Sequence, residues 1–343
     1  MTRRDFLTLA PAGGAVMRGW AGLAFGQTGT TARSINTVRG PIAADALGLT
    51  LPHEHVLVDF VGADRVSPSR YDADAAFRKV LPHLEEIYRL GVRTLVECTP
   101  AYLGRDVRLL RRLSEASRLH ILTNTGYYGA ADDKFLPPHA FTETADQLAA
   151  RWTAEARDGI EGSGMLPAFM KIGVDGGPLS AVDEKLVRAA ARTHRATGLP
   201  IYSHTGDGVA ALAQLAVLED ERVALDGFIW VHAQNERDGA VHLSAARRGA
   251  WVAFDGLAER NVDRYVAVTV VMRNAGLLDR LLVSHDAGWY RVGETGGGEY
   301  RPHTDLFTHL LPALRARGLS DADITRLTTT NPRTALTPRT RNS

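Results

Sequence analysis

Two histidines in a short apolar segment are the first residues whose types and spacing could do chemistry. His53 and His55 flank Glu54. Side chains of a strand alternate between its two faces, so the histidines would share one face and Glu54 would point to the other. Two imidazoles at this spacing can bind one metal ion. The pair alone is weak evidence, because two histidines on one strand are often structural.

Three more candidate ligands stand at the ends of apolar segments later in the chain. His204, His232 and Asp286 each come at the end of a short apolar run. Each of them alone could be a hydrogen-bonded polar residue near the rim of a sheet. The repeated pattern favours a shared metal site if the fold brings these segment ends together.

Lys171 is an unusual member of this group. It follows an apolar run, where burial of an ammonium group is costly. An ammonium has no lone pair and cannot bind a metal ion. Desolvation could favour the neutral amine, or the amine could react with CO2 to give a carbamate whose two oxygens bridge two cations. A lysine paired with a carboxylate such as Asp286 is the remaining alternative.

Eight apolar segments alternate with segments of helical periodicity, and this order predicts how the candidate ligands are positioned. The expected strands are 49–58, 94–99, 120–126, 168–174, 200–205, 228–233, 251–255 and 281–286. The expected helices are 72–90, 105–118, 141–160, 183–197, 208–218, 236–248, 263–275 and 303–317. Strands separated by helices predict a parallel sheet, and eight such units predict an α/β fold, a single (β/α)8 TIM barrel. Active sites of this fold lie at the C-terminal ends of the strands, so the candidate ligands would converge there.

Length and composition agree with one soluble enzyme domain. The 343 residues exceed the roughly 250 that such a barrel needs. Hydrophobic residues make up 45% and charged residues 23%, and the net charge is +1. Nothing in this balance indicates a nucleic-acid partner. The single cysteine, Cys98, cannot form an internal disulfide and says little about the compartment.

The candidate ligands resemble the ligand set of the phosphotriesterase family of the amidohydrolase superfamily. The resemblance runs from about residue 40 to residue 332. The residues and motifs that carry it are His53-Glu54-His55, Gly104-Arg105-Asp106, Thr125-Gly126-Tyr127-Tyr128, Lys171, His204, His232 and Ser284-His285-Asp286.

The resemblance implies a two-metal hydrolase. A carboxylated Lys171 would bridge two divalent metal ions, with zinc as the default and cobalt, manganese or iron as alternatives. The more buried ion would be bound by His53, His55 and Asp286, and the more exposed ion by His204 and His232. A metal-bridging hydroxide would attack a small-molecule lactone, carboxylic ester or phosphoester, and Asp286 would accept its proton.

One departure from the family bears on the substrate. Organophosphate hydrolases of the family carry an Asp–His proton relay after the sixth and seventh strands, where this chain has Asn235 and Gly256. This difference argues against specialised triester hydrolysis. The other readings are an amide or cyclic-amide hydrolase and a barrel that binds a ligand without catalysis. The sequence does not determine the oligomeric state; a homodimer is one option.

Five residues are candidates for the substrate pocket. Tyr102 stands in the region where lactonases of the family have a pocket tyrosine, and Tyr128 follows the third strand. Asp255 ends the seventh strand and could support a ligand or face the substrate. Trp289 and Arg291 belong to a loop, 287–302, that is either a substrate lid or a surface loop.

The N-terminus has the features of an export signal. Arg3 and Arg4 form a twin-arginine motif, residues 9–25 are weakly apolar, and small residues precede Gln27. This order predicts a signal peptide over residues 1–26, read by the twin-arginine export machinery, and a periplasmic or secreted enzyme. An ordinary basic N-terminus on a cytoplasmic enzyme is the alternative. A linker over 27–38 and a hydrolase domain over 39–337 would follow.

Replacing Arg3 and Arg4 together by lysine tests the export signal. The twin-arginine machinery requires the arginine pair, so the periplasmic amount of the protein, measured by immunoblot of cell fractions, should fall to background while total expression stays constant. An unchanged periplasmic amount would refute the assignment.

Overall fold

The computed structural model describes residues 33–339. The predicted signal peptide and the first residues of the predicted linker lie outside this range. Within it, no helix combines the length and the apolar character that crossing a membrane requires.

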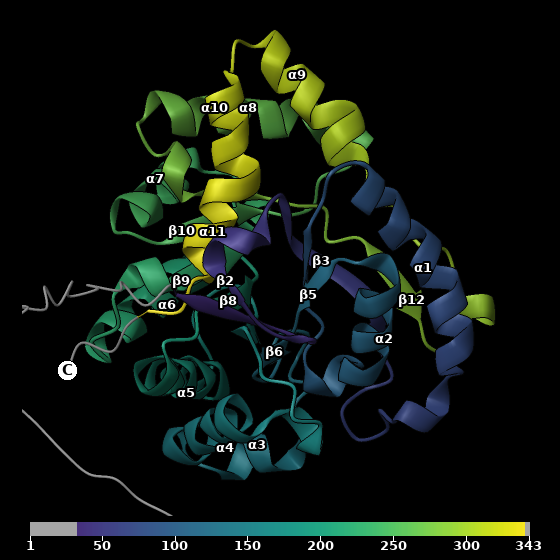
Figure 1. The fold of residues 1–343 in the computed structure, drawn as a ribbon. Helices are drawn as coiled ribbons and strands as arrows, with labels where there is room; N and C mark the ends of the chain where they lie inside the picture. Colours follow the sequence, from purple (N-terminus) through teal and green to yellow (C-terminus); the bar gives the residue numbers. More distant parts are fainter. Residues whose placement is uncertain (1–32, 340–343) are drawn as a thin grey trace, which may run out of the picture. The chain divides into compact units, whose positions relative to one another are not determined.

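Parallel strands form the centre of the molecule (Figure 1). They are β3 (Thr50–Val58), β4 (Thr94–Glu97), β5 (His120–Leu122), β6 (Asn124–Thr125), β7 (Phe169–Val174), β8 (Ile201–Thr205), β9 (Phe228–Val231), β10 (Trp251–Phe254), β11 (Leu281–Val283) and β12 (Gly288–Arg291). Along the sheets, the order is β12-β3-β4-β5 in one and β6-β7-β8-β9-β10-β11 in the other.

The two sheets join into one ring, because each junction is a single interrupted strand. Only Thr123 separates β5 from β6. At the other junction, β11 pairs with β10, and its continuation β12 pairs with β3. Backbone hydrogen bonds from His55 N to Ala287 O (2.9 Å) and from Asp286 N to His53 O (3.1 Å) fasten the segment between β11 and β12 to β3. The eight strands predicted from the sequence therefore form the predicted (β/α)8 barrel.

Helices surround the strands in chain order (Figure 1). They are α1 (Ala73–Arg89), α2 (Val107–Ser117), α3 (Pro138–Thr142), α4 (Ala145–Asp158), α5 (Ala181–Thr197), α6 (Gly208–Asp220), α7 (Gly239–Arg247), α8 (Val262–Asn274), α9 (Leu311–Ala316), α10 (Asp321–Thr325) and α11 (Asn331–Leu336). Seven of them begin after a residue whose side chain accepts a hydrogen bond from the first turn, which explains where these helices start: Asp72, Asp106, Thr144, Ser180, Asp207, Asp238 and Ser320.

The interior of the barrel is an apolar core beneath the candidate ligands. Its largest side chains come from strand positions that face inward: Leu122, Phe169, Tyr202, Ile229, Val231, Trp251 and Leu282. Ile35 from the N-terminal hairpin and Leu336 from α11 pack against the same core. The polar layer at the C-terminal ends of the strands therefore rests on a packed apolar floor.

The structure corrects the predicted linker at its C-terminal end. Strand β1 (Ser34–Thr37) pairs in antiparallel register with β2 (Gly40–Ala43). Ile35 is buried in the barrel core, and Val38 N donates to Ile121 O (3.0 Å). The folded domain therefore includes residues that their Ser- and Thr-rich composition assigned to a linker, because one buried isoleucine and hairpin pairing outweigh local composition. The sequence also did not indicate β12, α3, α10 or α11.

Candidate metal centre

One cavity of about 380 Å³ collects all six predicted metal ligands at the C-terminal ends of the strands. His53 and His55 come from β3, Lys171 from β7, His204 from β8, His232 from the residue after β9, and Asp286 from the segment after β11. The four imidazoles form a continuous row. Ring centroids are 5.3 Å apart between His55 and His53, 5.2 Å between His53 and His232, and 4.4 Å between His232 and His204.

Asp255 orients two of these histidines from behind. Its carboxylate lies 2.8 Å from His53 Nδ1 and 2.6 Å from His232 Nδ1, and the side chain is only 1% exposed. Although burial opposes ionisation, the two histidines hold the pKa of Asp255 well below its usual range. An ionised carboxylate only accepts hydrogen bonds, so both Nδ1 atoms must carry the hydrogen and both Nε2 atoms are left to face the cavity. Asp255 thus supports ligands and does not line the cavity as a substrate residue.

Protons compete with a metal ion differently at these two rings. Burial, and then the charge of Lys171, lowers the pKa of His53 to about 4, so its Nε2 lone pair is free at neutral pH. Burial also acts on His232, but the attraction of Asp255 outweighs it and the pKa of His232 is raised. A metal ion therefore competes with a proton at His232 up to a higher pH than at His53, and binding should weaken as the pH falls.

Thr99 fixes the orientation of His55 in the same way. Thr99 Oγ1 lies 2.8 Å from His55 Nδ1, and its hydroxyl hydrogen is within reach of Glu97 Oε1 (2.5 Å) and Leu57 O (3.0 Å). Because the hydroxyl donates to one of these oxygens, it accepts from His55 Nδ1. His55 Nε2 is then a lone pair that faces Asp286 Oδ1 at 2.9 Å.

Asp286 completes a group of converging acceptors. Its Oδ1 lies 3.7 Å from His53 Nε2 as well as close to His55 Nε2. Burial would raise the pKa of Asp286, but the nearby histidines, His55 first, hold it at about 2, so the carboxylate is ionised. With neutral histidines, two nitrogen lone pairs and a carboxylate oxygen this close would repel one another unless a shared proton or a metal ion lies among them. The donor set therefore fits a divalent metal ion.

Lys171 is a buried lysine, 2% exposed, whose amine has no hydrogen-bond partner among residues 33–339. The ion pair with Asp286 that the sequence left open is not formed. Its charge lowers the pKa of both His53 and His204, after the larger effect of burial, so the side chain lies near both histidine pairs. An unpartnered buried ammonium is costly, and conversion to an anionic metal ligand would remove that cost.

The walls of the cavity are mostly aromatic and apolar. Tyr128 lines the cavity and its hydroxyl lies 2.9 Å from His204 Nδ1. Trp289 also lines it and makes a T-shaped ring contact with His55 (centroids 5.2 Å apart). Phe60 and Phe135 complete this wall; they follow β3 and β6, and only their position in loops after strands could have indicated them. Arg291, a predicted pocket residue, instead lies half-exposed beside Glu294 (3.8 Å) and does not line the cavity.

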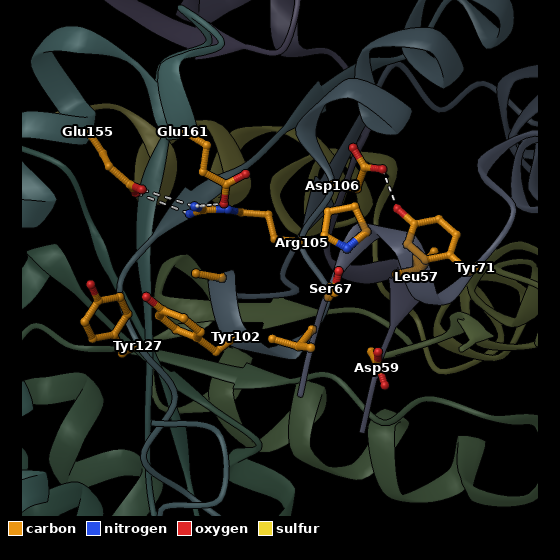
Figure 2. Close-up of a pocket in the computed structure, with 14 residues that line it drawn as sticks. Leu57, Asp59, Ser67, Tyr71, Tyr102, Arg105, Asp106, Tyr127, Glu155 and Glu161 are labelled. Atoms are coloured by element: carbon orange, nitrogen blue, oxygen red, sulfur yellow. Dashed lines mark hydrogen bonds and ion pairs between the residues drawn. The ribbon is translucent and has the colours of Figure 1, made fainter. Parts of the chain in front are cut away.

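Tyr102 lines a different cavity. This second cavity, of about 270 Å³, lies beside the β4–α2 loop, and Figure 2 shows Tyr102 and Tyr127 together on its wall. The buried guanidinium of Arg105 contacts Glu155 (3.2 Å) and Glu161 (2.9 Å) there. Tyr102 therefore does not line the cavity that contains the candidate metal ligands. Of the neighbouring tyrosines after β6, Tyr127 belongs to this cavity and Tyr128 to the metal cavity.

Gln234 packs closely against Gly256, the position of the relay histidine in the family's organophosphate hydrolases. Its side chain donates to Asp255 Oδ1 (2.9 Å) and accepts from Asp255 N (3.1 Å). A Cβ atom on Gly256 would come 3.0 Å from Gln234 Nε2, so a side chain at position 256 would require Gln234 to shift.

Fold and site together define a (β/α)8 barrel with a histidine-rich centre that could hold metal ions. The chain belongs to the phosphotriesterase family, whose model matches residues 33–336. This is a family of enzymes that depend on two metal ions, and it includes hydrolases.

Three relatives illustrate the range of the family. A phosphotriesterase homology protein of Escherichia coli is 29% identical over 292 residues, which cover 84% of this chain and 97% of the relative. An aryldialkylphosphatase of Saccharolobus solfataricus is 27% identical over 304 residues, covering 85% and 96%. An N-acetyltaurine hydrolase of Rattus norvegicus is 24% identical over 354 residues, covering 88% and 97%.

Replacing Asp255 by asparagine tests the support of the histidines. The amide can accept from only one of the two Nδ1 groups and must present a donor to the other. Metal affinity, measured by competition with a chelating dye, should fall about 10- to 100-fold. Asp226→Asn, which alters a half-exposed carboxylate paired with Arg339, is the matched control and should bind metal normally. Equal affinities for all three proteins would show that Asp255 has no such role.

Proposed function

We propose that this protein is a hydrolase that uses two divalent metal ions, by default zinc, to cleave a lactone, carboxylic ester or phosphoester. The observation that carries the proposal is the convergence of four oriented histidines and one ionised carboxylate on a buried cavity with an unpaired lysine. When bound, the ions would polarise the substrate oxygen and make water nucleophilic at neutral pH. Membership of a family that contains an aryldialkylphosphatase supports this chemistry.

The proposed assignment of ligands follows the two ends of the histidine row. His53, His55 and Asp286 would hold one ion, because their ligand atoms all lie within 4.8 Å of one another. His204 and His232, whose rings are adjacent, would hold the other. Lys171, carboxylated, would bridge the two, in agreement with its position near both pairs and its lack of a partner.

Asp286 is our candidate for the proton acceptor. It is the only carboxylate among the described residues that lines the cavity, and its side chain is 22% exposed. It can therefore take a proton from water at the reacting centre and release it to solvent. Because Gly256 stands where the relay histidine would be, residue 256 offers no side chain to which Asp286 could pass that proton.

The cavity walls indicate the rest of the substrate. Phe60, Phe135 and Trp289 offer aromatic surface in the cavity that contains the candidate ligands, so they would pack against an apolar acyl or alkyl group. The Tyr128 hydroxyl, beside His204, is placed to contact the polar end of the substrate. An ester or lactone with a medium-sized apolar substituent matches this distribution better than a highly charged substrate.

Amide hydrolysis is the second candidate. A relative bears the name N-acetyltaurine hydrolase, and the same metal centre could activate water against an amide carbonyl. Amides differ from esters chiefly in needing protonation of the leaving nitrogen, for which Asp286, once protonated, is the available group.

A substrate panel on metal-loaded protein tests the proposal. Lactones, aryl esters, phosphotriesters and N-acyl amides should be compared, and an ester or lactone should give the highest kcat/KM. Chelation should abolish turnover and divalent metal should restore it. His204→Ala should lower kcat/KM by more than about 100-fold, whereas His309→Ala, which alters a half-exposed histidine on the outer surface, should not. Purified protein without metal and without turnover would favour a non-catalytic binding protein.

Lys171→Ala tests the bridging role. The variant should lose most metal and activity, and short carboxylic acids such as propionate should partly restore both by supplying the missing carboxylate. Lys185→Ala, at a partly exposed lysine that donates to Phe141 O, is the control. Carbon-13 NMR after incubation with labelled bicarbonate should show a carbamate in the wild-type protein and in Lys185→Ala but not in Lys171→Ala. An unmodified lysine in fully active, metal-loaded protein would exclude the carbamate.

A further inference from the structure

Glu54, which stands between two candidate ligands, points away from the cavity and is fully buried. Its carboxylate accepts five hydrogen bonds. Oε1 accepts from Ser284 Oγ (2.7 Å), His285 N (3.1 Å) and His285 Nδ1 (2.6 Å). Oε2 accepts from Ala287 N (2.9 Å) and His303 Nδ1 (3.0 Å). Four of the five donors belong to residues 284–287, the segment that carries Asp286.

This segment has a conformation that needs support. Asp286 has φ of 51°, in the left-handed region that residues with a side chain rarely adopt. The backbone N–H groups on both sides of it, those of His285 and Ala287, donate to the single carboxylate of Glu54. Gly288 follows, and a side chain there would collide with His55 O. Glu54 therefore binds the turn at the peptide group directly after Asp286 and at the one that precedes His285, while Asp286 N itself donates to His53 O (3.1 Å).

The cluster of Glu54, His285 and His303 is not a third metal site. Their ligand atoms lie within 4.8 Å of one another, but the ring nitrogens are already used. Leu306 N donates to His285 Nε2 (3.0 Å), which leaves His285 Nδ1 as the donor to Glu54. His303 Nε2 pairs with the Tyr300 hydroxyl (3.2 Å). The cluster is a closed hydrogen-bond network that joins β3, the turn and the 300–306 segment.

We infer that Glu54 is a positioning residue for the metal centre: its carboxylate holds the 284–287 turn so that Asp286 Oδ1 lies 2.9 Å from His55 Nε2. Glu54, a residue of strand β3, thus connects β3 to the segment that follows β11. Its neighbours His53 and His55 provide ligands on the inner face, and Glu54 sets the third ligand from the outer face. The catalytic consequence rests on the proposed function, whereas the position of Asp286 can be measured independently of it.

Glu54→Gln is the sharpest variant, because all five partners are donors and a glutamine must present its own NH2 group to some of them. Whichever way the amide is oriented, at least one of the two peptide N–H groups beside Asp286 faces a donor. The expected result is a 10- to 100-fold loss of metal affinity at about one of the two sites per chain, and a comparable fall in kcat with KM changed less than about twofold.

The matched control is Asn331→Ala. Asn331 is buried and its Nδ2 donates to Leu278 O and Leu281 O (2.8 Å each), so it holds the opposite end of β11. This variant should lower the Tm without changing metal stoichiometry or kcat. A purely structural role for Glu54 would make the two variants alike, with lower Tm but normal metal content.

The readouts are metal per chain by mass spectrometry, chelator competition, kcat and KM, and a crystal structure of Glu54→Gln. Displacement of Asp286 from His55 with loss of metal supports the inference; an unmoved Asp286 with wild-type affinity overturns it. If Glu54→Gln does not fold, His303→Phe, which removes one bond to Glu54 and none to a candidate ligand, must show a smaller loss of affinity in the same direction, and wild-type affinity overturns the inference. If the wild-type protein binds no metal, the proposed function is refuted. In that case the crystal structure of Glu54→Gln still shows whether Glu54 positions Asp286.

Discussion

The organisation of this site depends on buried carboxylates that do not line the cavity. Asp255, Glu97 and Glu54 lie behind the candidate ligands, and burial of each would be costly without donors around both oxygens. Those donors are the groups that must be oriented: the rings of His53 and His232 for Asp255, and the turn around Asp286 for Glu54. The hydrogen bonds that satisfy these buried carboxylates are therefore the same ones that orient the candidate ligands toward a metal ion.

The barrel provides the rigidity that this arrangement requires. An apolar core fills its interior, and the N-terminal hairpin and α11 close it from one end. The polar layer therefore has packed side chains beneath it, and each ligand comes from a different strand with its own backbone pairing. Burial above this core favours a neutral His53, whereas the nearby histidines keep Asp286 ionised against the effect of burial.

The wall between the two cavities shows how neighbouring residues acquire different roles. Leu57 faces the Arg105 cavity and Val58 the metal cavity, and Tyr127 and Tyr128 divide in the same way. Tyr127 and Tyr128 are the same residue type, so only the direction of the backbone determines that Tyr128 lies beside His204 and Tyr127 beside Tyr102. Substrate contacts in this fold consequently depend on loop geometry after the strands more than on composition.

The sequence by itself determined the eight strands, the barrel and the identity of the six converging residues. It did so because apolar runs with polar C-terminal ends repeat in a parallel fold, and because inward-facing positions such as Lys171 and His204 follow strand alternation. Only the tertiary structure decided how the side chains of His232 and Asp286 reach the cavity. His232 would point outward by alternation, and its left-handed φ of 63° turns it into the cavity. Asp286 depends on a turn held by Glu54, and Asp255 proved to support histidines and not to face substrate. Such features arise from hydrogen bonds between residues some 20 to 230 positions apart, which no local pattern records.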